Sequence, residues 1–267
     1  MQLDPIIKLS KDLKTASVML SKTEARYLVD SYYQMQANRI RSNEQIRSLS
    51  TNNEPHQVLE WLSENSRLLE NNIKRALDAY SDGFEVGLWS KSIVGIGPVI
   101  AAGLLAHIDM DKAPTAGHIF SFAGLVSGVE WKKGQKRPWN ADLKSLCWKI
   151  GESFVKFSGH KNDFYGKLYL ERKAIEKERN DQGLFENQAK TQLEKFNFGK
   201  STDAYKHYIK GKLPPAHIHA RARRWVVLLF LSHWHEVAYK EHYGREAPEP
   251  YAIGILKHGH RINPPNI

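Results

Sequence analysis

The stretch from Ser92 to Ile108 constrains the fold most strongly, because two glycines and a proline interrupt an otherwise apolar run. Gly95 and Gly97 can adopt positive φ angles without steric cost, so we expect a tight hairpin there. Pro98 suits the first turn of a helix, where its missing N–H lacks an intrahelical acceptor in any case. The pattern predicts a helix-hairpin-helix element with an alanine- and leucine-rich second helix.

Such a hairpin can hold a phosphate through the backbone N–H groups of Gly95, Ile96 and Gly97 at the positive end of the helix dipole. Contact of this kind recognises the nucleic-acid backbone and carries no sequence information. The alternative interpretation is an ordinary tight turn between two helices.

The charge distribution favours the phosphate interpretation. The 267 residues have a formal net charge of +10. Residues 1–90 carry 11 Lys and Arg against 12 Asp and Glu, whereas the remaining residues carry 28 against 17. The whole excess therefore lies at and beyond the hairpin, as expected if that part of the chain faces a polyanion.

The composition also limits the compartment. A single cysteine, Cys147, excludes an internal disulfide and fits a reducing cytoplasm, and its apolar neighbours predict a buried, inert thiol. The longest purely apolar run, from Trp225 to Leu231, is too short to span a bilayer, and we find no basic-then-apolar signal region. We expect a cytoplasmic protein without a membrane partner.

We expect residues 1–88 to form an antiparallel helical stalk, which is a helical hairpin or a coiled coil. A capping box at Ser21–Glu24 opens a helix to about Leu49, and residues 52–55 separate it from a second helix. The stripe that could seal this pair, or recruit a second chain, comprises Leu28, Tyr32, Met35, Ile46 and Leu49 on the first helix and Leu62, Leu69, Ile73, Leu77 and Tyr80 on the second.

Residues 89–267 should form a basic, predominantly α-helical domain. Helices are expected near 116–122, from Ala141 to about Phe157 behind an Asn140 cap, near 162–180, and from about Ala216 to Tyr243 as the central core helix. Residues 126–139 are rich in Gly and Lys and predict a small β-hairpin or an exposed loop.

That loop contains the densest basic and aromatic cluster of the chain. Cations there can neutralise phosphates, and tryptophans offer stacking faces for unpaired bases, although the indoles could equally anchor the turn to the core. The residues that we predict to contact nucleic acid here are Lys132, Lys133, Lys136, Arg137 and Trp139, followed by Lys144.

A second candidate surface opens the core helix. Cations near a helix N-terminus are locally unfavourable unless an anion is bound, which predicts a phosphate or RNA contact. The alternative is that the arginines pair with carboxylates from elsewhere in the fold. The residues concerned are His217, His219, Arg221, Arg223 and Arg224.

We find no pattern that indicates catalysis, a cofactor or a metal. His-x-His pairs occur at 217/219, 233/235 and 258/260, and on a helix this spacing points the side chains of the first two pairs apart. The spacings of zinc sites are absent. No phosphate-loop motif is present, and no acidic set of the kind that binds two Mg²⁺ ions in nucleases.

The stretch from Ser92 to about Phe157 resembles the C-terminal domain of the bridge-RNA-guided insertion-sequence transposases. The matching residues are Ile93–Ala102, Phe120–Leu125 and the basic Gly134–Arg137 ahead of a helix. Aligned without gaps, the position of that family's nucleophilic serine falls on Lys132, with Ser127 nearby. The helical stalk stands where that family has an acidic nuclease domain.

A stalk ahead of such a domain is similar to the Nop-domain proteins of box C/D ribonucleoproteins and, more closely, to the Tas proteins of TIGR (tandem interspaced guide RNA) systems. This resemblance implies a nuclease-free, prokaryotic or phage-encoded protein that binds a structured guide RNA and, through it, target DNA. It also implies a homodimer formed through the stalk. Two alternatives stay open. One is a transposase or accessory protein that uses Ser127 or a partner's nuclease domain, and the other is a guide-independent helix-hairpin-helix DNA-binding protein.

Overall fold

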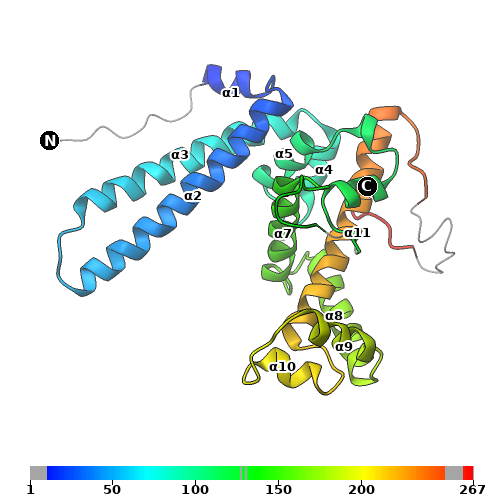
Figure 1. The fold of residues 1–267 in the computed structure, drawn as a ribbon. Coiled ribbons are helices and arrows are strands. Elements are labelled where there is room, and N and C mark those ends of the chain that lie inside the picture. Colours follow the sequence, from blue (N-terminus) through cyan, green and yellow to red (C-terminus); the bar gives the residue numbers. More distant parts are fainter. Residues whose placement is uncertain (1–10, 127, 130, 250–260, 267) are drawn as a thin grey trace. The chain divides into compact units, whose positions relative to one another are not determined.

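A computed structural model describes residues 11–126, 128–129, 131–249 and 261–266, and within these ranges the chain is helical, without a β-strand (Figure 1). The predominantly α class is confirmed. The described part of 126–139 consists of turns and irregular backbone, so of the two options for this segment the exposed loop is correct and the β-hairpin is wrong. No helix in the described ranges combines the length and apolarity needed to cross a membrane.

The elements follow one another as α1 (Lys11–Ser17), α2 (Lys22–Thr51), α3 (Gln57–Asp82), α4 (Glu85–Ser92), α5 (Pro98–His107), the short 3₁₀ helix η1 (Met110–Lys112), α6 (Ala116–Phe122), α7 (Ala141–Lys156), α8 (Tyr165–Asp181), α9 (Glu186–Lys195), α10 (Asp203–Tyr208) and α11 (Pro215–Tyr243).

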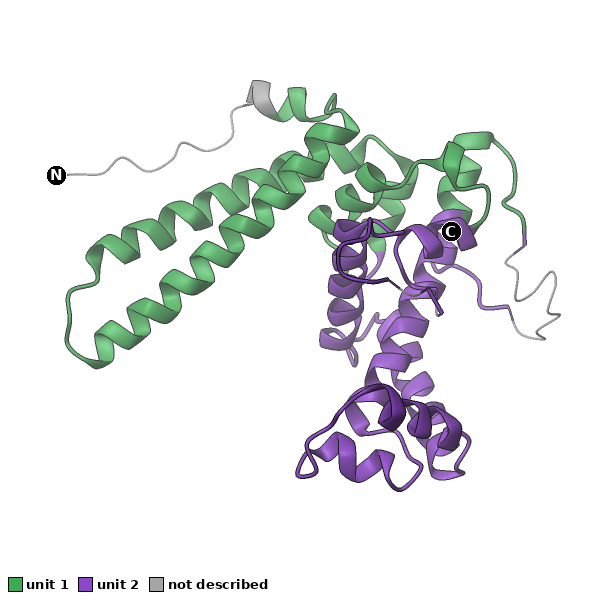
Figure 2. Ribbon diagram, in the orientation of Figure 1, with its two compact units in different colours: residues 1–92, 96–115, 236–248 green, residues 93–95, 116–235, 249–267 purple. Residues whose placement is uncertain are grey.

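The contacts divide the chain into two compact units (Figure 2). Unit 1 contains residues 1–92, 96–115 and 236–248, and unit 2 contains residues 93–95, 116–235 and 249–267. The predicted stalk therefore shares its unit with α5 and with the last turns of α11.

Unit 1 is built on the antiparallel pair α2 and α3 (Figure 1). The predicted capping box is present: the Glu24 N–H donates to Ser21 Oγ (3.2 Å), and the Ser21 N–H donates to Glu24 Oε2 (2.9 Å). α5 packs against both helices, with Ala101, Ala102 and Leu104 fully buried. Burial of this apolar helix supplies much of the core of unit 1.

The residues in the seam between α2 and α3 differ in part from the predicted apolar stripe on α3. Ile73, Leu77 and Tyr80 are at least partly buried, but Leu62 and Leu69 are 43% and 36% exposed. Ser63 and Glu70, one position after Leu62 and Leu69, contact α2 instead, and Ser66 between them is buried.

Polar contacts thus join α2 and α3 alongside their half-buried apolar residues. Ser63 Oγ donates to Asn43 Oδ1 (2.7 Å), and Arg39 Nε donates to Glu70 Oε2 (2.6 Å), while Gln36 Nε2 reaches Glu70 Oε1 (3.3 Å). Burial acts to raise the pKa of the Glu70 carboxyl, but the hydrogen bonds from Arg39 and Gln36 outweigh it, so the pKa lies below its ordinary value.

Unit 2 is organised by an aromatic cluster that joins α7, α8 and α11. The rings of Phe154 and Tyr165 stack with their centroids 4.8 Å apart, and Phe230 meets both edge-on at 5.4 and 5.3 Å. All three side chains are fully buried. The prediction that the segment around Trp225–Leu231 forms a core helix is confirmed.

A smaller apolar cluster joins α9, α10 and the first turn of α11. It consists of Phe185, Ala189, Tyr208, Leu213 and Ile218. Asn180 ties this cluster to α8, since its Oδ1 accepts from the Leu213 N–H (2.8 Å) and its Nδ2 donates to the Leu213 carbonyl (3.0 Å).

The Arg39–Glu70 pair yields a stability prediction. Glu70→Ala leaves the Arg39 guanidinium unpaired in a partly buried seam, so it should lower the free energy of unfolding by about 1–3 kcal/mol. The double replacement Arg39→Met with Glu70→Leu should recover that loss, because it removes both polar groups. Urea unfolding of the full chain measures both, and equal losses in the single and double variants would contradict the assignment.

The pH dependence provides a second readout of the same pair. A depressed pKa means that Glu70 contributes stability above the pKa of an unfolded glutamate, about 4.3, and that this contribution is lost as the pH falls through the folded-state value. Glu70→Ala should therefore flatten the fall in stability on the acid side.

Candidate nucleic-acid interface

The basic loop between α6 and α7 is closed at its base by the backbone. The Asn140 N–H donates to the Phe122 carbonyl (2.8 Å), and the Leu125 N–H donates to the Phe120 carbonyl (2.9 Å). As predicted, Asn140 caps α7, its Oδ1 accepting from the Leu143 N–H (2.8 Å). The last residue of α6 and the cap of α7 are therefore held side by side.

Trp139 has a fixed seat within this loop. A Cβ atom placed on Gly124 would lie 2.6 Å from Trp139 Cγ, so the indole ring packs directly on the glycine backbone, whose φ is +63°. Lys144, one turn into α7, places its Nζ 4.1 Å from the Trp139 ring centroid. This cation–π contact and the glycine seat orient the ring.

A hollow of about 490 Å³ opens beside this ring. Its lining combines two aromatic rings, a proline, an amide and two cations, namely Phe122, Trp139, Pro138, Asn140, Lys136 and Arg137. All six residues belong to unit 2.

Three of the predicted cations converge on this region from separate segments. Burial lowers the pKa of Lys144, and the nearby charges of Arg224 and Arg137 lower it further. The charges of Arg137 in the loop and of Arg224 on α11 thus act on Lys144 of α7, whose ammonium lies over the Trp139 ring.

The other tryptophan of the loop has a structural contact. Trp131 Nε1 donates to the Gln135 carbonyl (2.8 Å), and the Arg137 guanidinium lies over its ring at 5.1 Å. Lys132, Lys133 and Lys136 extend from the same loop with exposed side chains. They are sterically available for the predicted backbone contacts.

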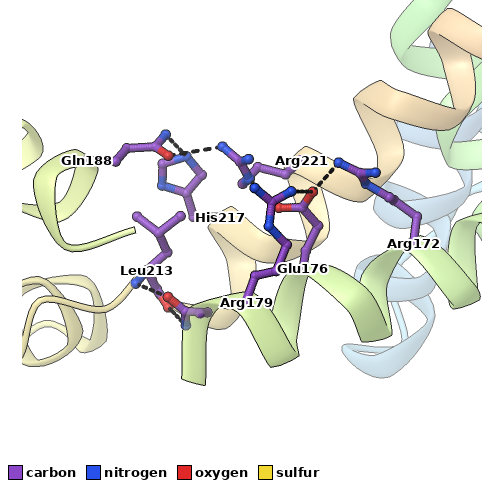
Figure 3. Close-up of polar contacts among 8 residues, drawn as sticks. Arg172, Glu176, Arg179, Gln188, Leu213, His217 and Arg221 are labelled. Carbon is purple, nitrogen blue, oxygen red and sulfur yellow. Dashed lines mark hydrogen bonds and ion pairs between the residues drawn. The ribbon is translucent and has the colours of Figure 1, made fainter. Parts of the chain in front are cut away.

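Arg221 is engaged inside the protein (Figure 3). Glu176 is 1% exposed and accepts from Arg221 Nε (2.7 Å) and Arg172 Nη2 (2.5 Å), while Arg179 lies 3.9 Å from it. Arg221 also donates to Gln188 Oε1 (3.0 Å) and covers the Phe185 ring at 4.4 Å.

Arg223 is engaged in the same way, through an ion pair with Glu152 and a contact over the Trp148 ring (5.5 Å). The alternative that we stated for this surface, arginines paired with carboxylates, therefore describes Arg221 and Arg223. Arg224 is exposed. RNA contact by these three residues stays a prediction, and Arg224 is the one best placed for it.

The two histidines of this surface are hydrogen-bonded to tyrosines. His217 Nδ1 lies 3.2 Å from Tyr208 Oη, and His219 Nδ1 lies 2.7 Å from Tyr169 Oη. Burial lowers the pKa of both histidines, helped by neighbouring arginines. They are therefore neutral at pH 7 and add no positive charge to the surface.

The glycine hairpin differs in part from its prediction. Gly95 has a φ of +95°, as predicted for a tight turn, and its carbonyl accepts from Ser153 Oγ (2.5 Å). Gly97, however, has a φ of −100° in extended backbone, so the expectation of a positive φ there is wrong. Pro98 opens α5 as predicted. Phosphate binding by Gly95, Ile96 and Gly97 stays a prediction.

Other candidates carry little chemistry. Cys147 is 1% exposed, and burial raises the pKa of its thiol to about 12, which agrees with an inert thiol. Within the described ranges, no three His, Cys, Asp or Glu side chains gather as a metal site would require. Ser127, His258 and His260 lie outside the described residues.

Sequence reasoning missed Phe122, Gly124 and Glu176. Phe122 is the last residue of a correctly predicted helix, and Gly124 follows it at a turn, so their positions carried a signal of the loop but none of the hollow. Glu176 is one of several acidic residues on α8, and its burial depends on α11, which lies far from it in sequence.

Residues 90–150 match the sequence model of the transposase family described as IS116/IS110/IS902. The matched segment contains Trp139, Lys144 and the basic loop but covers less than a quarter of the chain. It supports a relation to IS110-type transposases. Comparisons with curated proteins and with solved structures find no match.

The seat of Trp139 can be tested with a matched pair of glycines. Gly124→Ala adds a methyl group against the indole ring at a positive φ, whereas Gly134→Ala adds one at a φ of +92° with nothing within 4 Å. Gly124→Ala should lower the free energy of unfolding by about 1–3 kcal/mol more than Gly134→Ala, because overpacking adds to the backbone strain that both share. Equal losses in thermal or urea unfolding would show that Trp139 does not rest on Gly124.

Proposed function

We propose that this protein binds a structured guide RNA and, through it, target DNA, without cleaving either. The observation that carries the proposal is the basic and aromatic surface at Trp139, where Lys144 lies over the indole ring and Lys136 and Arg137 line the hollow beside it. This surface lies in the segment that matches the transposase family. The charges of Arg137 and Arg224 also act on Lys144. Cations this close repel one another, and a bound polyanion would neutralise them.

The charge asymmetry along the chain supports a nucleic acid as that polyanion. The excess of basic residues lies beyond residue 90, and the exposed lysines of the loop extend the same surface. In guided complexes the protein contacts backbone and shape while base pairing supplies the sequence specificity. The resemblance to Nop-domain and Tas proteins favours RNA as the first ligand.

The absence of cleavage is part of the proposal and rests on the sequence. The position of the family's nucleophilic serine falls on Lys132 when the segment is aligned without gaps. A lysine side chain there serves phosphate contact rather than nucleophilic attack.

A homodimer through the stalk completes the proposal. Val58, Leu62 and Leu69 lie on α3 with 77%, 43% and 36% of their surface exposed, outside the seam with α2. Burial of such a stripe against a second copy would stabilise a dimer.

Sedimentation velocity tests this part of the proposal. Leu62→Glu with Leu69→Glu should shift the protein from dimer to monomer, whereas Ile40→Glu, which charges a similarly exposed residue of α2, should leave the dimer intact. A wild-type monomer at micromolar concentration would dismiss it.

A transposition function is the second candidate, and the family match is the observation that favours it. It requires strand cleavage or a covalent DNA adduct that Ser127→Ala abolishes. A guide-independent DNA-binding protein is the third, and high-affinity binding of duplex DNA by RNA-free protein would favour it.

The deciding experiment for the main proposal is sequencing of the nucleic acid that co-purifies with the protein. A discrete short RNA, encoded beside the gene, is the expected result, and heterogeneous fragments would count against a guide. The same preparation can be assayed for cleavage of DNA complementary to that RNA.

Salt titration then tests the loop. Removing Lys132, Lys133 and Lys136 by alanine substitution should reduce the slope of log Kd against log salt by about 2, since each phosphate contact contributes roughly 0.7 to 0.9. The control replaces Lys200, Lys206 and Lys210, three exposed lysines of the α10 region, and removes the same charge from the same unit. Equal effects of the two triple variants would indicate a general field rather than contact.

A further inference from the structure

We infer that the hollow beside Trp139 holds one unpaired nucleotide, with its base against Phe122 and Trp139 and its phosphate near Lys136, Arg137 and Lys144. This inference rests on the proposed function and specifies which feature of the bound nucleic acid this site recognises. The ligand class is a single-stranded segment of RNA or DNA.

The size and lining of the hollow fit such a ligand. Its volume of about 490 Å³ lies within the range of small-molecule sites, about 300–1,000 Å³. Phe122 is 43% exposed although it is aromatic, so its ring is available to a base. Two cations, Lys136 and Arg137, belong to the same lining and can meet the phosphate of a stacked nucleotide.

The walls are held in place before any ligand arrives. Phe122 ends α6, Asn140 caps α7, and the backbone hydrogen bond between them (2.8 Å) fixes their separation. Trp139 rests on Gly124. Preorganised aromatic walls lower the ordering cost of binding, which distinguishes this site from a flexible basic loop.

The Lys144 side chain lies over the Trp139 ring, with its Nζ 4.1 Å from the ring centroid. Burial and two neighbouring cations lower the pKa of Lys144, which means that they disfavour its charged form. A bound phosphate would relieve this, because the flexible lysine side chain can turn from the ring toward the phosphate.

The chemistry of the walls selects an unpaired base but not a particular one. Bases within a duplex have both faces covered by their neighbours, and only an unstacked base can lie against Phe122. Asn140 Oδ1 is engaged by the Leu143 N–H, which leaves its Nδ2 group as a donor. One donor cannot distinguish four bases, so we expect recognition that tolerates sequence.

Two fluorescently labelled strands of about twelve nucleotides test the inference by anisotropy with the full-length protein, freed of nucleic acid in high salt. One is an oligoadenylate RNA, and the other is a strand of equal length and charge in which every base is absent. The wild type should bind the RNA about tenfold more tightly than the abasic strand.

Variants locate the source of that preference. Phe122→Ala and Trp139→Ala should each reduce it severalfold, and Trp139→Phe should retain most of it. Trp148→Ala, which removes an exposed tryptophan of α7 outside the hollow, should leave it unchanged. Phe122 is exposed, so its variant decides the matter even if Trp139→Ala fails to fold.

The outcomes separate this inference from the proposed function. Equal, salt-dependent binding of both strands would retain nucleic-acid binding and overturn the pocket. A preference that survives Phe122→Ala would likewise overturn it, because the bases would then be bound elsewhere. Failure to bind either strand at low salt would also overturn the pocket, whereas the proposed function is decided by the nucleic acid that co-purifies with the protein.

Discussion

The packing of Phe230 against Phe154 and Tyr165 is the contact on which unit 2 depends. It joins α7, α8 and α11 through ring centroids 4.8 to 5.4 Å apart. Aromatic pairs of this geometry combine a large buried area with a preferred orientation. Because Lys144 lies on α7 and Arg224 on α11, the same contact that builds the core also brings these two cations near each other.

The fold then divides the cations into two groups. Arg221 and Arg223 meet the carboxylates of Glu176 and Glu152, and in doing so they fasten α11 to α8 and α7. Lys144 and Arg224 meet another positive charge instead. Removing one partner of such an ion pair leaves an uncompensated charge, which destabilises the fold. Like charges that lie close together repel one another, and a bound anion reduces that repulsion.

In unit 1, polar side chains lie in the seam between α2 and α3, and some leucines of α3 lie outside it. The seam between α2 and α3 contains Ser66 and the Arg39–Glu70 pair, while Leu62 and Leu69 point away from it. Polar groups inside a helical pair reduce its stability but fix its register, since only one alignment satisfies them. The apolar residues displaced from the seam are then free to serve an intermolecular contact.

The sequence by itself determined the helices and the surplus of charge. The Ser21 capping box, Pro98 at the start of α5 and Asn140 at the start of α7 are local signals, because their partners lie within four residues along the chain. The stripe on α3 failed at Leu62 and Leu69 because a shift of one residue turns a helical side chain by about 100°, and spacing alone did not choose between the two registers. Only the tertiary structure decided that Arg221 is paired with Glu176 while Arg224 is exposed, and that Phe122 and Trp139 line one hollow. Those outcomes depend on which residues meet across long stretches of sequence, and that meeting is set by packing rather than by any pattern within a segment.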